Sequence, residues 1–145
     1  MSQGVLGFKY EEEKRDTGMT GLAGLPIYLD LLHAMGLPEM IGRHLQVKQR
    51  GWTDVQMVIS LMLLNISGGD CVEDLSKVEK DEGFCRILRW VEQQGMKRRE
   101  RRELERRWRK ERRRSVPSPS AAFRYLSAFH DEDQEGKRSF RPHLH

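Results

Sequence analysis

The most apolar stretch of the chain, VQMVISLMLLNI, covers residues 55–66. Its 12 residues are too few to span a bilayer, which takes about 20, so the stretch is typical of a helix buried inside a domain. Thr53 and Gln56 match the pattern of a capping box at its start, and Gly68-Gly69 follows its end. Because nearly every side of this helix would be apolar, we expect it to lie at the centre of the fold.

Other helices are predicted by apolar residues spaced three and four apart, with capping residues between them. The predicted N-caps are Asp70, Asp81 and Ser118, and Pro38 and Pro119 suit first helical turns. The residues that we expect to face the core are Leu25, Leu29, Leu32, Met35, Met40, Ile41, Leu45, Val72, Leu75, Val78, Phe84, Ile87, Leu88, Val91, Phe123 and Leu126, with Phe129 as a further candidate.

No segment has a convincing strand pattern, so the sequence predicts an all-α protein. We expect a small bundle of about five or six short helices, one long protruding basic helix, and flexible termini. The predicted divisions are a flexible segment 1–19, a helical core 20–95, a basic helix 96–115, a closing helix packed on the core 116–130, and a disordered tail 131–145. No signal peptide is visible, and Cys71 and Cys85 are expected to be buried, reduced thiols of a cytoplasmic protein.

The basic stretch MKRRERRELERRWRKERRR covers residues 96–114 and holds 12 Lys or Arg and 4 Glu. Its net charge is +8, whereas the whole chain carries +4, so the rest of the chain carries −4. Its residues favour a helix, and only Leu104 and Trp108 form an apolar pair, so the helix should project from the bundle.

Two interpretations of this helix stay open. Basic residues around its whole circumference favour a solvated helix, whereas the surplus charge favours contact with phosphates, which is the interpretation that we prefer. In the closing helix, serines at the N-terminus suit phosphate and an arginine suits phosphate or a guanine edge, although an ordinary packed helix fits equally well. The candidate DNA-binding residues are Arg98, Arg99, Arg101, Arg102, Arg106, Arg107, Arg109, Lys110, Arg112, Arg113, Arg114, Ser118, Ser120 and Arg124.

Catalytic and metal sites are not predicted. Asp70, Glu73 and Asp74 could in principle hold Mg²⁺, but capping and a polar helix face explain them better. The histidines do not have zinc-site spacing with the cysteines, and no phosphate-binding loop or nucleophile motif is present. The sequence therefore predicts no cofactor or metal for this chain.

Three segments carry a resemblance to a known family: GLAGLPIYLDLLHAMGL, GWTDVQMVISLMLLNISGGDCVEDLSKVEKDEGF and VPSPSAAFRYLSAFHDEDQE. In order and spacing they resemble the N-terminal region of bacterial insertion-sequence transposases of the DDE type. The most specific pieces are GGDCVEDL at 68–75 and PSPSAAFRYL at 117–126, and the resemblance covers residues 4–135.

The resemblance implies an all-helical region that binds the ends of a mobile element, followed in the family by a domain in which two Asp and one Glu hold Mg²⁺ for strand transfer. No residue here matches one of those catalytic positions, so we expect a chain truncated before that domain and inactive alone. The implied partner is double-stranded DNA of the element ends, in the nucleoid and not at a membrane. The alternatives are a module that forms homodimers or that dimerises with and inhibits full-length transposase, and, more weakly, non-specific RNA binding.

Overall fold

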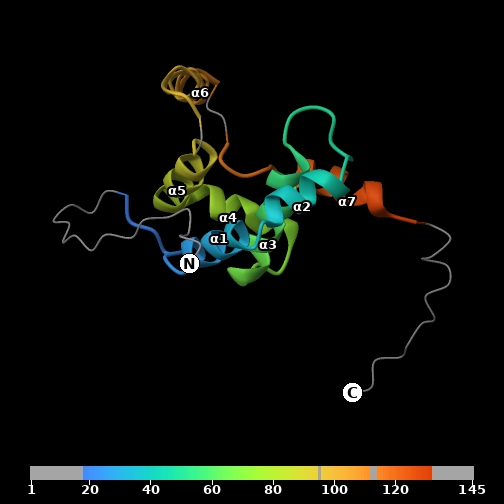
Figure 1. The fold of residues 1–145 in the computed structure, drawn as a ribbon. Coiled ribbons are helices and arrows are strands. Elements are labelled where there is room, and N and C mark those ends of the chain that lie inside the picture. The colour runs from blue at the N-terminus through green and yellow to red at the C-terminus, as the bar shows by residue number, and fades with distance from the viewer. Residues whose placement is uncertain (1–17, 95, 112–113, 132–145) are drawn as a thin grey trace.

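The computed structural model describes residues 18–94, 96–111 and 114–131. In this part of the chain all regular structure is helical, which confirms the all-α prediction (Figure 1). The elements are α1 (Leu25–Ala34), α2 (Leu37–His44), α3 (Asp54–Ile66), η1 (Val72–Asp74), α4 (Leu75–Lys80), α5 (Glu82–Glu92), α6 (Arg98–Glu111), α7 (Pro119–Leu126) and η2 (Ser127–Phe129). The predicted flexible ends, apart from residues 18, 19 and 131, lie outside the described residues.

Helix α3 is the centre of the bundle, as its apolar sequence predicts. The hydroxyl of Thr53 accepts a hydrogen bond from the N–H of Gln56 at 3.2 Å, and the Gln56 side chain accepts one from the N–H of Thr53 at 2.9 Å. This capping box fixes the start of the helix, and Gly68, whose φ is +79°, turns the chain away after its end. Helices α1, α2, α4 and α7 all pack against α3.

Asp81 joins two parts of the bundle through one carboxylate. One oxygen accepts the N–H of Phe84 at 2.8 Å and caps α5, as predicted. The other accepts the hydroxyl of Thr20 and the N–H of Gly21, each at 2.9 Å. Burial raises the pKa of Asp81, but these donors outweigh it and hold the pKa below its ordinary value.

The core differs from the prediction at the ends of several helices. Met35 and Met40, predicted to face inward, are 67% and 54% exposed. Met35 follows the last residue of α1, and Gly36, with a φ of +69°, turns the chain there. In α2 only Ile41 is buried, because a short helix presents few side chains to α3 and the preceding residue points about 100° away.

The predicted cap of the short helix after α3 is also wrong. Asp70 does not cap it, and the N–H of Asp70 instead donates to the carboxylate of Asp74 at 3.1 Å. Leu75 and Val78 are buried as predicted, whereas Val72 is half-buried. The turn at Asp70 is therefore closed by the side chain of Asp74, which lies four residues later.

Helix α6 stands clear of the bundle beyond the end of α5, as predicted for a helix without a wide apolar face (Figure 1). It is a separate helix and not a continuation of α5, which ends at Glu92. The carboxylate of Glu100 accepts the N–H of Lys97 at 2.8 Å at its start. None of the helices in the described ranges has the length and apolarity needed to cross a membrane.

Candidate nucleic-acid interface

The basic residues of α6 whose side chains are described are all exposed. They are Arg98, Arg99, Arg101, Arg102 and Arg106. None of these five arginines forms an ion pair with another described residue. Each guanidinium is therefore free to meet an anionic partner at little cost in broken contacts. Arg107, Arg109 and Lys110 belong to the helix, but their side chains lie outside the described residues, as do Arg112 and Arg113 entirely.

The helical register gathers part of this charge into a stripe. Arg98, Arg102 and Arg106 recur every four residues and so lie along one side of α6, with Arg99 next to them. Glu100 and Leu104 lie on the opposite side, where they border a hollow of about 260 Å³. Arg101 lies off the stripe and the backbone register places Arg107 on the opposite side, so basic residues also occur around the rest of the helix, as the sequence predicts.

The chain returns to the bundle after α6 through a cluster of hydrogen bonds around Glu79 of α4. Its carboxylate accepts the N–H of Ser115 at 2.9 Å and the N–H of Val116 at 3.0 Å. The guanidinium of Arg89, in the last turn of α5, donates to the Ser115 hydroxyl at 2.9 Å. Val116 and Pro117 are fully buried beyond this point. We call α6 and the residues that join it to the bundle the arm. The C-terminal end of the arm is thus fixed to both α4 and α5.

Arg114 belongs to this return segment and not to the exposed stripe. It is half-buried, and its Nε donates to the carbonyl of Val116 at 3.2 Å. Its Nη2 is buried without a hydrogen-bond partner among the described residues. Of the candidate arginines with described side chains, Arg114 is therefore the least available to a phosphate.

The three candidates in the closing helix have different environments. The hydroxyl of Ser118 accepts the N–H of Ala121 at 3.2 Å, which confirms it as the N-cap of α7. The Ser120 hydroxyl is exposed and lies 3.2 Å from that of Ser118. Arg124 is exposed, and its Nε donates to the carbonyl of Ser120 at 3.3 Å. Ser118 thus has a structural role, whereas Ser120 and Arg124 face solvent.

The buried face of α7 is not the predicted one. Phe123, Leu126 and Phe129 were expected inward but are 51%, 41% and 52% exposed, whereas Ala122 and Tyr125 are buried. Burial, and then the neighbouring Asp54 carboxylate, raise the pKa of Tyr125 to about 12. Contact with α3 and η1 has selected this face, and the buried Tyr125 is unavailable to a partner.

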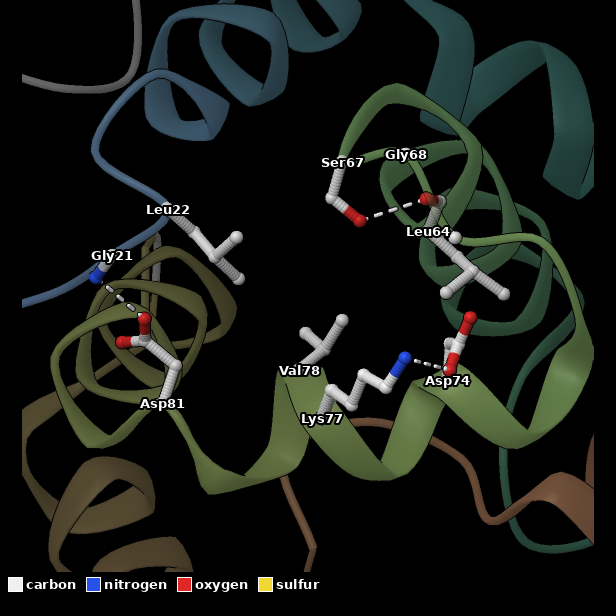
Figure 2. A pocket seen from close by; sticks show the side chains of 10 residues that line it. Gly21, Leu22, Leu64, Ser67, Gly68, Asp74, Lys77, Val78 and Asp81 are labelled. Carbon is white, nitrogen blue, oxygen red and sulfur yellow. Dashed lines mark hydrogen bonds and ion pairs between the residues drawn. The ribbon is translucent and has the colours of Figure 1, made fainter.

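The acidic residues near Asp70 have protein partners in the structure. Asp74 pairs with Lys77 at 2.6 Å, and this hydrogen bond is the largest cause that lowers the pKa of Asp74. Asp74 and Lys77 border a cavity of about 350 Å³, into which Leu22, Leu64 and Val78 point (Figure 2). No cluster of three His, Cys, Asp or Glu suited to a metal ion occurs among the described residues.

The two cysteines are free, but only one is buried as predicted. Cys85 lies inside α5, and burial is the largest cause that raises the pKa of its thiol. Cys71 is exposed in the turn before η1, so the prediction of a buried thiol is wrong there.

Sequence reasoning missed one group of exposed cations. Arg43 at the end of α2 and Arg50 in the loop before α3 are both exposed, and Lys48 between them is half-buried. The segment QVKQRGW in this loop, residues 46–52, has the composition of a polar turn. The available signal was the absence of any Asp or Glu from residues 41–53.

Comparison with known proteins identifies no relative: no protein-family model, curated protein or solved structure matches this chain.

Proposed function

We propose that the chain binds double-stranded DNA, with α6 as its main contact. The observation that carries this proposal is the stripe of Arg98, Arg102 and Arg106 on a helix that stands clear of the bundle, where these three arginines form no ion pair with another described residue. A helix whose only role is solubility would gain from pairing its arginines with its own glutamates. Here the described arginines remain unneutralised.

The dimensions of α6 suit a phosphate backbone. A helix of 14 residues is about 20 Å long, and a duplex of that length carries about 12 phosphate charges. Each arginine that neutralises a phosphate releases a condensed counterion, which favours binding at low salt. The four arginines on or beside the stripe predict a binding constant that falls with salt with a logarithmic slope of about 3 to 4.

The resemblance to transposases narrows this proposal. A DNA-binding helical region in such a protein would hold the ends of a mobile element in the bacterial nucleoid, while strand transfer would need the Mg²⁺-dependent domain of the family. We therefore assign to this chain DNA binding in transposition, without a catalytic step of its own.

The test is fluorescence anisotropy with a labelled duplex, measured over a range of salt concentrations. Replacing Arg98, Arg102 and Arg106 by Gln should weaken binding by more than about tenfold and reduce the salt slope by about 3. The matched control replaces Lys77, Lys80 and Arg86, exposed cations of α4 and α5, by Gln and changes the net charge equally. Equal losses in both variants, or no binding by the unchanged protein, would reject α6 as the interface.

A second candidate function is supported by exposed apolar side chains. Ile27, Leu31 and Met35 follow one another every four residues along the outside of α1 and are 62%, 52% and 67% exposed. Phe123 and Leu126 form a similar surface on α7. These surfaces suit a module that dimerises or that binds and inhibits full-length transposase. Co-purification with intact transposase in high salt, lost on replacing Leu31 by Lys, would favour this function over DNA binding.

A further inference from the structure

The segment that ends α2 and leads into α3 is strongly biased in charge. Residues 41–53 contain Arg43, Lys48 and Arg50 and no acidic residue. The whole chain carries a net charge of +4, residues 96–114 carry +8 and residues 41–53 carry +3. The rest of the chain therefore carries −7. Among the described residues, positive charge is therefore concentrated in these two segments, of which the sequence makes only α6 obvious.

The loop in this segment is held in a defined position by the start of α3. The carboxylate of Asp54 accepts the N–H of Lys48 at 3.1 Å, and the capping box at Thr53 fixes the next turn of the chain. The bond to Lys48 uses its backbone, so its ammonium group remains available. Arg43, Lys48 and Arg50 form no ion pair with another described residue.

Asp54 is the first residue of α3, and α7, more than 70 residues away in the sequence, packs against α3. Figure 1 shows α7 at the same end of the bundle as the loop that precedes α3. Tyr125 is the buried neighbour of the exposed Arg124. Folding thus brings Arg124 to the same end of the bundle as the loop.

The charge at this end remains positive. The segment 115–130, which includes α7, holds Arg124 and no acidic residue, and the exposed Asp131 follows it. Asp54, the acidic residue where the two segments meet, is buried, so little of its charge reaches the surface. Glu39 lies one helical turn before Arg43 on the same side of α2 and offsets part of its charge, which leaves Lys48, Arg50 and Arg124 as the surplus.

We propose that Arg43, Lys48, Arg50 and Arg124, here called the loop surface, form a second contact with the phosphate backbone of duplex DNA. This inference rests on the proposed function of α6. The loop after α2 and the helix α6 rise on the same side of the bundle in Figure 1. A DNA duplex, which is a straight and uniformly charged rod, can therefore contact the loop and α6 at the same time. A compact acidic protein would have to match two separate surfaces.

The experiment compares three variants of the full chain in the anisotropy assay. Lys48→Gln with Arg50→Gln neutralises two loop cations but leaves the backbone bond to Asp54 intact. The matched control, Lys80→Gln with Arg86→Gln, removes the same charge from exposed positions of α4 and α5. The α6 variant with Arg98, Arg102 and Arg106 replaced by Gln reports on the proposed function separately. Circular dichroism confirms that each variant is folded.

The loop variant should weaken duplex binding several-fold and reduce the salt slope by about 2, while the control changes neither by as much. If the loop variant binds like the unchanged protein while the α6 variant does not, the loop surface is rejected and the proposed function stands. If the unchanged protein does not bind duplex DNA, both fail. Loss of binding to duplex RNA that equals the loss for DNA would overturn the assignment to DNA.

A second measurement does not depend on neutralising charge. A photo-cross-linking group at the exposed position 49 should form adducts with the labelled duplex, and the same group at position 80 of α4 should not. Adducts at both positions or at neither would contradict a defined contact at the loop surface.

Discussion

Phe84 in α5 and Leu104 in α6 are apolar residues of neighbouring amphipathic helices, and their environments differ sharply. Phe84 is fully buried among the residues of the bundle core, whereas Leu104 is only half-buried and borders a hollow formed by residues of its own helix and by Met96, two residues before it. The helices α1, α2, α4 and α5 each bury at least one residue in the common core, while α6 has no described buried residue.

The difference shows which interactions stabilise the bundle and which stabilise α6. Helices of 6 to 13 residues, like those of the bundle, are at best marginal alone in water, so they depend on tertiary packing. Helix α6 has 14 residues and relies on residues with high helix propensity. The bundle should therefore respond to lost packing, and α6 to changes in charge.

The largest effect is expected from Phe84→Ala. Removing a fully buried phenyl ring should lower the free energy of unfolding by about 3 to 5 kcal/mol, whereas Leu104→Ala should cost less than about 1 kcal/mol. Urea denaturation followed by circular dichroism measures both. Similar costs at the two positions would show that α6 shares the core after all.

Alkaline pH tests the burial of Tyr125. Because its pKa is raised to about 12 from an ordinary 10.0, the folded state favours the protonated hydroxyl. This contribution is complete below pH 10 and is lost as the pH rises through 12, by up to about 3 kcal/mol.

Tyr125→Phe should flatten this alkaline loss, and it should cost little at neutral pH because the hydroxyl has no hydrogen-bond partner among the described residues. Tyr28→Phe, the same change at a side chain that is 46% exposed, serves as the control. The free energy of unfolding is measured by denaturation at pH 8, 10 and 11. If Tyr125→Phe loses as much stability at alkaline pH as the unchanged protein, the Tyr125 side chain lies in solvent.

The Glu79→Ala variant tests the junction between the bundle and α6. It leaves the N–H groups of Ser115 and Val116 without their carboxylate acceptor, so we expect a loss of about 2 kcal/mol. Glu79→Gln, which keeps one acceptor oxygen, should lose less. Thermal unfolding provides the measurement, with the exposed Glu82→Ala as control; equal shifts at positions 79 and 82 would remove the case for a fixed junction.

The smallest expected effect is at the start of α3. Thr53→Ala removes the hydroxyl that caps this helix and should cost about 1 kcal/mol, whereas Thr53→Ser keeps the acceptor and should cost less. Chemical denaturation of the two variants side by side gives the difference, and a Ser variant as destabilised as the Ala variant would argue against the cap.

Features that depend on close neighbours in sequence were predicted from the sequence, and features chosen by distant contacts were not. The caps at Thr53, Asp81 and Ser118 are correct because each bonds to a residue three positions later. In α7, apolar residues occur on every side of a helix of eight residues, so periodicity could not choose between Phe123 and Tyr125. Packing against α3 and η1 made that choice.

The same division applies to the candidate site. The charge of α6 is evident from composition, and its stripe follows once the helix bounds are known. The loop surface was missed because more than 70 residues separate Arg50 from Arg124, and only the packing of α7 against α3 brings their segments to one end of the bundle. No local pattern in the sequence encodes that contact.

The hydrogen bond between Arg89 and Ser115 has a further consequence for how this chain is built. Arg89 and Ser115 touch although they are 26 positions apart, so α6 lies on an excursion that leaves the bundle after the end of α5 and returns to the same place. Replacing the excursion by a short Gly-Ser linker should leave a bundle that folds alone and lacks the arm. Conversely, the arm could be lengthened, recharged or exchanged without disturbing the residues that support it.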